Sequence, residues 1–381
     1  MQPQDHTEIQ SRQEPSFLNP QEYTLIQSLL DPILRRSNLS LARIEPLSLS
    51  LYPVYVARLS NGSNLLVKFG PAPSARLLRL EKRGLENEIL ALRAIISQST
   101  LAVPRISGPD EMLTISPTFP MPLSSLTHTI LTCPSGTPLP SLFPPGMSRC
   151  QIPTPGMLIQ GLSPTFLATL YRTLGAAFRE LVQVHPEDPG IWGSIPSRRG
   201  SATTLAAKGP SGSDGAGSNT SWQAAFLSMM EASLRDAEDM LVSIPYDAIR
   251  VQIAQHSSSL ESFREPSALV PLDVLDAANV MVDERTGEVV GLSGLGPCVW
   301  GDIRVGHWVA EWENLTEFWE GFGTLPKNER DGKEGVRYLL YTVYRSLTAI
   351  NRHYYRPDEG GDELDPRRTL TWALNQLAAL T

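Results

Sequence analysis

Residues 269–283 read Leu-Val-Pro-Leu-Asp-Val-Leu-Asp-Ala-Ala-Asn-Val-Met-Val-Asp and are the most informative stretch of this 381-residue chain. Gly-Glu-Val-Val-Gly-Leu-Ser-Gly follows at 287–294, and Trp-Gly-Asp occupies 300–302. Asp273, Asp276 and Asn279 of the first stretch carry polar side chains that can accept a proton or ligate a hard cation. Any chemistry of this chain is therefore expected to centre on this segment.

Composition narrows the possible functions before any motif is considered. The chain is 41% hydrophobic and carries a net charge of −8, and no cluster of Lys and Arg marks one face, so nucleic acid is not an expected partner. No apolar run approaches the roughly 18 residues that span a bilayer, and the polar N-terminus does not resemble a signal peptide. Three cysteines without metal-ligand spacing are typical of reduced thiols in a cytoplasmic protein.

The N-terminal third predicts a tail followed by a β-rich lobe. Residues 1–19 are polar and are expected to be a disordered tail. Residues 20–132 alternate helical stripes with apolar runs, which predicts an N-terminal β-rich lobe. Helices are expected at 20–36 and 74–96, and strands at 41–51, 54–59, 65–69, 103–106, 112–115 and 126–132. The turn Ser60-Asn61-Gly62-Ser63 predicts a hairpin between the second and third strands.

The remainder predicts a helical lobe interrupted by irregular segments. Residues 133–160 are proline-rich and are predicted to be an insertion, whereas 161–381 form a C-terminal helical lobe with a Gly/Ser-rich loop at 196–220. Helices are expected after Ser163, after Ser221 and over most of 307–379, with breaks at 325–333 and 357–366. The tryptophans Trp308, Trp312 and Trp319 are expected in the core, although they could also line an acceptor pocket.

The segment at 269–302 resembles the active-site core of the aminoglycoside phosphotransferases, which are small-molecule kinases with a protein-kinase-like fold. The resemblance covers roughly residues 40–320 and includes Leu66-Val-Lys-Phe-Gly-Pro71 and Ser221-Trp-Gln-Ala-Ala-Phe226. It is nearest to a branch common in filamentous fungi, some members of which neighbour natural-product gene sets. It implies an α+β, two-lobed fold, with a small antiparallel β lobe carrying one helix and a larger, mainly helical lobe.

The resemblance also implies a role for individual residues. Lys68 would contact the nucleotide phosphates, and Glu88 would hold Lys68 by an ion pair. Asp273 would be the base that accepts the proton of the substrate hydroxyl, and Asn279 would ligate magnesium. ATP, Mg²⁺ and a small-molecule ligand are thereby implied, while protein partners are not indicated. Asp302 matches a position that anchors the catalytic loop and is expected to be structural.

The chain departs from the family pattern at several of these positions. Pro271 stands where the family has the histidine of its His-x-Asp loop, and Asn279 follows Asp273 by six residues rather than five. The extra residue lies between them, so Asp276 is an alternative to Asp273 as the base. Gly294 replaces the aspartate that binds magnesium, and the stretch 46–55, where phosphate-binding glycines belong, contains no glycine. Gly294→Asp is accordingly expected to raise magnesium-dependent nucleotide binding.

Three functional hypotheses follow. The first is a degenerate kinase fold, either a pseudokinase or a tailoring protein repurposed to act on a small molecule, in fungal secondary metabolism. The second is an active ATP- and Mg²⁺-dependent small-molecule O-phosphotransferase with atypical metal ligands. The third is a non-catalytic scaffold whose partners bind the loops at 133–160 and 196–220. Whether the chain is an enzyme depends on how Pro271 and Gly294 are accommodated.

Overall fold

The structure is a computed structural model, and it describes residues 20–48, 51–72, 74–106, 113–114, 127–144, 152–153, 159, 161–195, 221–261, 263, 265–273, 275–323, 332–357 and 363–380. The predicted tail at 1–19 and the Gly/Ser-rich loop at 196–220 lie outside these ranges. The chain forms two compact units. One, here called the sheet unit, contains residues 1–71 and 107–132, and the other, the helical unit, contains 72–106 and 133–381.

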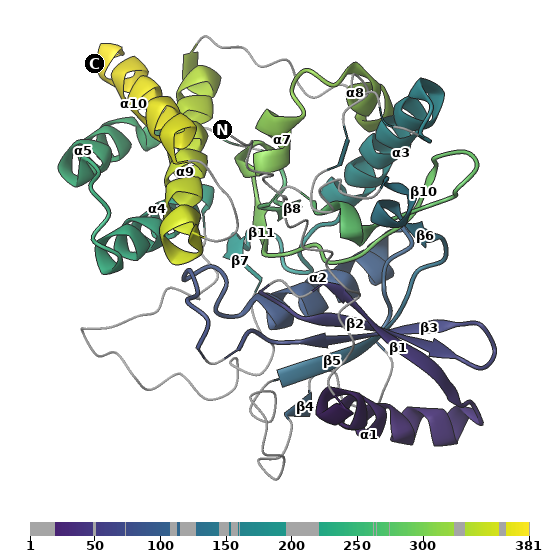
Figure 1. The fold of residues 1–381 in the computed structure, drawn as a ribbon. Helices are drawn as coiled ribbons and strands as arrows, with labels where there is room; N and C mark the ends of the chain where they lie inside the picture. The colour runs from purple at the N-terminus through teal and green to yellow at the C-terminus, as the bar shows by residue number, and fades with distance from the viewer. Residues whose placement is uncertain are drawn as a thin grey trace, which may run out of the picture. The chain divides into compact units, whose positions relative to one another are not determined.

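The sheet unit is an antiparallel sheet packed on one helix (Figure 1). The strands pair in the order β1-β2-β3-β5-β4. The elements are α1 (Pro20–Ser37), β1 (Leu41–Ser48), β2 (Val54–Leu59), β3 (Asn64–Phe69), β4 (Leu113–Thr114) and β5 (Thr127–Thr132). Leu25, Ile26 and Leu30 of α1 are buried against Val67 and Ile130 of the sheet. Alternation of apolar residues in the strands supplies the face that the helix covers.

The hairpin predicted at residues 60–63 is confirmed. β2 pairs antiparallel with β3, and the Leu59 N–H donates to the Ser63 carbonyl at 2.9 Å. Gly62 has φ +84°, and the Asn61 side chain accepts a hydrogen bond from the Ser63 N–H at 3.0 Å. Asparagine and glycine tolerate these conformations, so the local sequence alone specifies the turn.

The helical unit contains two three-stranded sheets, ordered β10-β9-β6 and β7-β11-β8, together with most of the helices. Its strands are β6 (Thr137–Pro138), β7 (Gly193–Ser194), β8 (Ala268–Pro271), β9 (Val280–Val282), β10 (Val289–Leu292) and β11 (Cys298–Gly301). Its helices are α2 (Gly84–Gln98), α3 (Pro164–Val182), α4 (Trp222–Asp239), α5 (Tyr246–His256), α6 (Ser258–Glu261), α7 (His307–Glu311), α8 (Thr316–Phe322), α9 (Gly332–Tyr355) and α10 (Leu364–Ala379). Short 3-10 turns η2 (Leu139–Leu142), η4 (Ala277–Asn279) and η5 (Ile303–Val305) join them.

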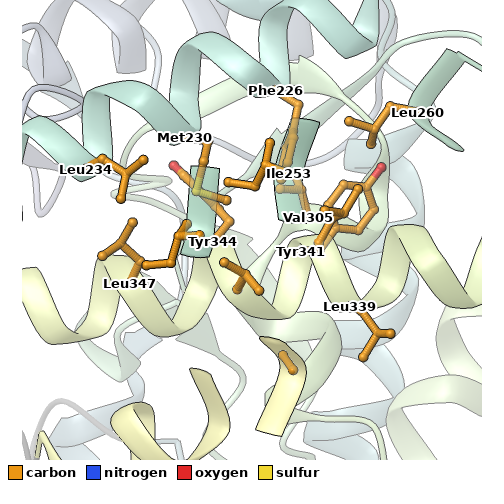
Figure 2. Packing of buried hydrophobic residues seen from close by; sticks show 14 of the residues in the cluster. Phe226, Met230, Leu234, Ile253, Leu260, Val305, Leu339, Tyr341, Tyr344 and Leu347 are labelled. Carbon is orange, nitrogen blue, oxygen red and sulfur yellow. The ribbon is translucent and has the colours of Figure 1, made fainter. Parts of the chain in front are cut away.

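One hydrophobic core of this unit lies between α4 and α9. Figure 2 shows Phe226 and Met230 of α4 directed toward Tyr341, Tyr344 and Leu347 of α9. Both helices carry their apolar residues at three- and four-residue spacings, which places these side chains on one face. The predicted start of α4 is confirmed, because the Ser221 hydroxyl accepts from the Ala224 N–H at 3.2 Å.

The sequence prediction was wrong at the start of α2. A helix was expected from residue 74, but α2 begins at Gly84. The preceding residues are held by side chains from distant parts of the chain: the backbone N–H of Arg79 donates to Asp236 at 3.1 Å, and Arg356 donates to Glu81 at 2.7 Å. Glu81 in turn accepts from the backbone N–H of Leu78 at 3.0 Å. Tertiary hydrogen bonds therefore replace the helical ones in this segment.

Other segments also differ from their predictions. The strand expected at 103–106 does not extend through 103–105, where Pro104 lacks an N–H for pairing. That segment and α2 belong to the helical unit, although the sequence placed both in the N-terminal lobe. Part of the proline-rich stretch is regular structure, because β6 pairs with β9. No helix within the described ranges combines the length and apolar character needed to cross a bilayer.

Candidate active site

Two strand pairings bring the candidate residues together within the helical unit. Cys298 of β11 pairs with Pro271 of β8, and Leu292 of β10 pairs with Val280 of β9. The Leu272 N–H donates to the Pro297 carbonyl at 2.9 Å. The loop that follows β8 therefore lies against the loop that follows β10. Asn279 lies against Gly294, and Asp273 faces Gly296, for this reason.

Asp273 forms an ion pair with Arg352, a residue of α9. Each side chain is 28% exposed, so the pair is partly shielded from water. Burial alone would raise the pKa of Asp273, but the charge and hydrogen bond of Arg352, with a smaller contribution from the charge of Arg356, lower it below the usual aspartate range. Asp273 is thus held ionised. The positive charge that faces its carboxylate is the guanidinium group of Arg352.

His307 lies beside this pair at the start of α7. The backbone N–H of His307 donates to the Leu272 carbonyl at 2.9 Å, which connects α7 to the loop carrying Asp273. Burial and the charge of Arg352 lower the pKa of His307 to about 3, so the imidazole is neutral at physiological pH. Among the described residues, its buried Nε2 atom has no hydrogen-bond partner.

Asp276, the alternative candidate for the base, caps η4. Its Oδ1 atom accepts a hydrogen bond from the Ala278 N–H at 2.8 Å. Burial raises the pKa of Asp276, and the capping bond opposes that effect. The inserted residue of this loop is therefore accommodated by a short capped turn, and one oxygen of Asp276 is engaged in holding it. The choice between Asp273 and Asp276 as a base stays a prediction.

Asn279 occupies the space beside Gly294. A β-carbon added at Gly294 would overlap the Oδ1, Cγ and Nδ2 atoms of Asn279. Gly294 has φ +57°, a left-handed conformation that costs side-chain-bearing residues free energy. The neighbouring Ser293 N–H donates to the Asn279 carbonyl at 2.8 Å. The expectation that Gly294→Asp restores a metal ligand therefore requires Asn279 to move.

Lys68 and Glu88 lie in different units. Lys68 is buried on β3 between Val54 of β2 and Thr129 of β5, and its Nζ lies 5.6 Å from the centre of the Tyr52 ring. Glu88 is buried on α2. A lysine on the third strand and a glutamate on the following helix are where the sequence placed them. Their ion pair stays a prediction.

Asp302 is confirmed as a structural residue. It is 0% exposed, and its carboxylate accepts from the Tyr341 hydroxyl at 2.8 Å and from the backbone N–H of Arg304 at 3.0 Å. Two buried guanidinium groups compensate its charge, since Arg337 and Arg304 lie 3.7 and 3.6 Å away. The Trp222 indole N–H donates to Tyr341 at 2.7 Å and extends the network to α4.

The tryptophans Trp308 and Trp312 are buried core residues, as predicted, and Trp319 is half-buried against them. The Trp319 indole N–H donates to the Trp312 carbonyl at 2.8 Å. The ring centres of Trp308 and Trp319 lie 6.4 Å apart. These aromatic contacts join α7 to α8.

No family model matches the chain, and no curated protein matches it. Solved structures do. A candidate fructosamine-3-kinase from Thermobifida fusca YX-ER1 has a TM-score of 0.55 and 15% identity over 93% of this chain and 99% of that chain. A second, from Haemophilus somnus 129PT, has a TM-score of 0.55 and 14% identity over 92% and 96%.

A thermostable mutant of aminoglycoside phosphotransferase APH(4)-Ia, in a ternary complex with AMP-PNP and hygromycin B, has a TM-score of 0.53 and 13% identity over 93% of this chain and 97% of that chain. The fold is protein-kinase-like. The α+β class expected from the sequence is thus confirmed, and the match extends over nearly the whole length of each neighbour.

The residues present do not fit a kinase-type magnesium site. Such a site needs a carboxylate at position 294, and neither Gly294 nor Ser293 supplies one. The side chain of Asn279 lies in the space where that carboxylate would begin. Within the described ranges, no group of three or more His, Cys, Asp or Glu side chains is placed to hold a metal ion.

Sequence reasoning missed Arg352 and His307. Arg352 is 79 residues from Asp273 and lies on a helix whose pattern shows only an apolar face. His307 lies five residues after Asp302, the last residue of Trp300-Gly-Asp302. Its spacing from other polar residues matches no metal or catalytic motif. Only the position of His307 near the quoted core could have drawn attention to it.

Proposed function

We propose that this protein is a pseudokinase, or a kinase-fold protein repurposed to act on a small molecule, and that it does not use magnesium to transfer a phosphoryl group. The observation that carries this proposal is the pairing of Asp273 with Arg352. In phosphoryl transfer a catalytic-loop aspartate must face the acceptor hydroxyl. Here an arginine of the same chain faces that carboxylate and lowers its pKa, which weakens it as a base.

The surroundings of Gly294 support the same proposal. A metal ion that bridges the phosphates neutralises charge that develops in the transition state, and several kcal/mol of stabilisation depend on it. Position 294 offers no carboxylate, and Asn279 fills the adjacent space. The stretch 46–55 also lacks the glycines whose N–H groups would contact phosphates. Three separate parts of the usual machinery have therefore changed.

An active small-molecule O-phosphotransferase is the second candidate. Burial of Lys68 on β3 and the ionised state of Asp273 favour it, because both are needed in that reaction. The solved neighbours include candidate fructosamine-3-kinases and an aminoglycoside phosphotransferase complex with AMP-PNP and hygromycin B. In this case ATP would bind at Lys68, and a different set of ligands would have to replace the lost carboxylate.

Calorimetric titration of ATP, with and without Mg²⁺, distinguishes the two candidates. The proteins needed are the wild type, Lys68→Ala, and Lys333→Ala as a control at an exposed lysine of α9. Under the pseudokinase proposal, Mg²⁺ changes the ATP affinity by less than about threefold, because the bridging carboxylate is absent. Magnesium-dependent tightening that vanishes in Lys68→Ala but persists in Lys333→Ala would establish the phosphotransferase instead.

On the sequence resemblance alone, we also propose a cytoplasmic protein of fungal secondary metabolism. Within the described ranges Cys298 is a buried free thiol, which supports a reducing compartment. Assignment to a natural-product gene set is testable by deleting the gene and profiling metabolites. An unchanged profile under producing conditions would count against it.

A further inference from the structure

A cavity of about 330 Å³ lies within the helical unit, between α4 and the segment that leads into α2. Six residues of α4 line this wall at spacings that keep them on one side of the helix, and four of them have small side chains: Ala225, Ser228, Ala232 and Ser233, beside Met229 and Asp236. These small side chains leave a space that larger ones would fill. The volume lies within the range of small-molecule sites.

The carboxylates in the lining already have arginine partners. Asp236 accepts from Arg79 at 2.7 Å, and Glu86 pairs with Arg83 at 2.7 Å. Lys82 is exposed at the lining, and the described residues give it no ion pair or hydrogen bond. The charged lining thus has three cations and two anions. A positive charge without an internal partner remains at Lys82.

The rest of the lining is apolar or weakly polar. Met229, Leu272 and Val299 contribute apolar surface, and Tyr344 lies beside them from α9. The Ser228 hydroxyl has no hydrogen bond to another described residue and can donate or accept one. Apolar surface with few polar groups is typical of sites that hold small organic ligands.

We propose that this cavity binds a small, mainly apolar molecule that carries one anionic group, with that group directed toward Lys82. The proposal deepens the proposed function, on which it rests, by naming the class of ligand. The cavity adjoins the candidate active site. Leu272 of its lining directly precedes Asp273, and the charge of Asp273 helps to raise the pKa of Tyr344, another lining residue. A polycation is disfavoured, since it would meet Lys82 while both lining carboxylates already have an arginine partner, although Arg79 is shared between Asp236 and Asp239.

Three probes with the same tail and different heads test this assignment: decanoate, decan-1-ol and decylamine. Each is titrated by calorimetry into the full-length protein without nucleotide. Decanoate is expected to bind at least about tenfold more tightly than decylamine, because the sign of the charge facing Lys82 is reversed. Lys82→Glu should shrink that ratio about fivefold or more, whereas Lys333→Glu, an exposed control, should leave it unchanged.

A second pair of variants tests the location. Ala232→Phe places a ring in the cavity and is expected to weaken all three probes by about tenfold or more. Ala224→Phe makes the same change on the exposed face of α4 and should have no effect. Equal effects of the two variants, tightest binding of decylamine, or no binding of any probe would overturn the proposal. Because no nucleotide is present, these outcomes are independent of the magnesium-dependence of ATP binding that tests the pseudokinase.

Discussion

Asp302 and Asp273 follow two neighbouring strands of one small sheet, yet their surroundings are opposite. Asp302 is buried and surrounded by groups that hold it, namely Tyr341, Arg304 and Arg337. Asp273 is partly exposed and has one strong partner, Arg352. Asp302, which maintains the fold, has several hydrogen-bond and ion-pair partners. Asp273, the candidate base, is paired with an arginine of the same chain. A buried carboxylate with several partners thus maintains the packing of this sheet, whereas the partly exposed one depends on a single ion pair.

The largest expected effect is at Asp302. Asp302→Ala would leave two buried guanidinium groups without this carboxylate, so we expect a loss of about 3–5 kcal/mol in the free energy of unfolding. Asp365→Ala is the matched control, because Asp365 pairs with Arg368 on an exposed surface and should contribute at most about 1 kcal/mol. Urea unfolding measures both. Similar losses would mean that the Asp302 network is not essential to the fold.

Alanine at Gly294 should have the next largest effect. Gly294→Ala meets both a left-handed backbone and the side chain of Asn279, and overpacking of this kind adds about 1–3 kcal/mol to the conformational cost. Gly296→Ala is the control, since Gly296 has φ +64° and its β-carbon would meet only Asp273 at 4.0 Å. Asn279→Ala should remove the difference between the two. A difference that survives in that background would contradict the account of this space.

The Asp273–Arg352 pair should show measurable coupling. A double-mutant cycle with Asp273→Asn and Arg352→Gln is expected to give about 1–3 kcal/mol at neutral pH. The lowered pKa of Asp273 means that this contribution is present at neutral pH and is lost as the pH falls through the folded-state pKa, below the usual aspartate range.

The exposed pair Arg172–Glu320 is the control for this cycle and should couple by less than about 1 kcal/mol. Coupling at Asp273 no larger than in the control would leave its carboxylate available to a substrate. That result would favour the phosphotransferase.

Close to neutral pH the smallest effect is expected from His307, because its contribution depends on pH and grows only on acidification. The folded pKa of about 3 lies below the ordinary value of 6.5, so the unfolded chain binds a proton that the folded protein does not between those two values. Stability should therefore fall with acidification in this window by up to about 1.4 kcal/mol per pH unit. His307→Asn should flatten this part of the curve and leave the slope above pH 7 unchanged. An identical slope in both proteins would show that His307 is not buried in neutral form.

Local patterns in the sequence were enough to predict much of the fold. The hairpin at 60–63 was predictable because Asn61 and Gly62 adopt its conformations without help from distant residues. The start of α3 was equally readable, since the Ser163 hydroxyl accepts from the Phe166 N–H at 3.1 Å and Pro164 fits the first turn. The order of the motifs at 269–302 further indicated the protein-kinase-like fold. The turn and the helix start are signals that act within a few residues along the chain, and the motif order is read along one continuous segment.

What surrounds the candidate site was decided by tertiary structure alone. The partner of Asp273 comes from α9, and the start of α2 is set by Asp236 of α4. The charge of the cavity depends on Arg79 neutralising that same Asp236. Coulombic and packing interactions depend on distance in space. Contacts between residues far apart in sequence produce no periodicity or spacing from which they could be predicted. The sequence by itself therefore determined which fold this chain adopts, and only the folded structure decided what the loop carrying Asp273 faces.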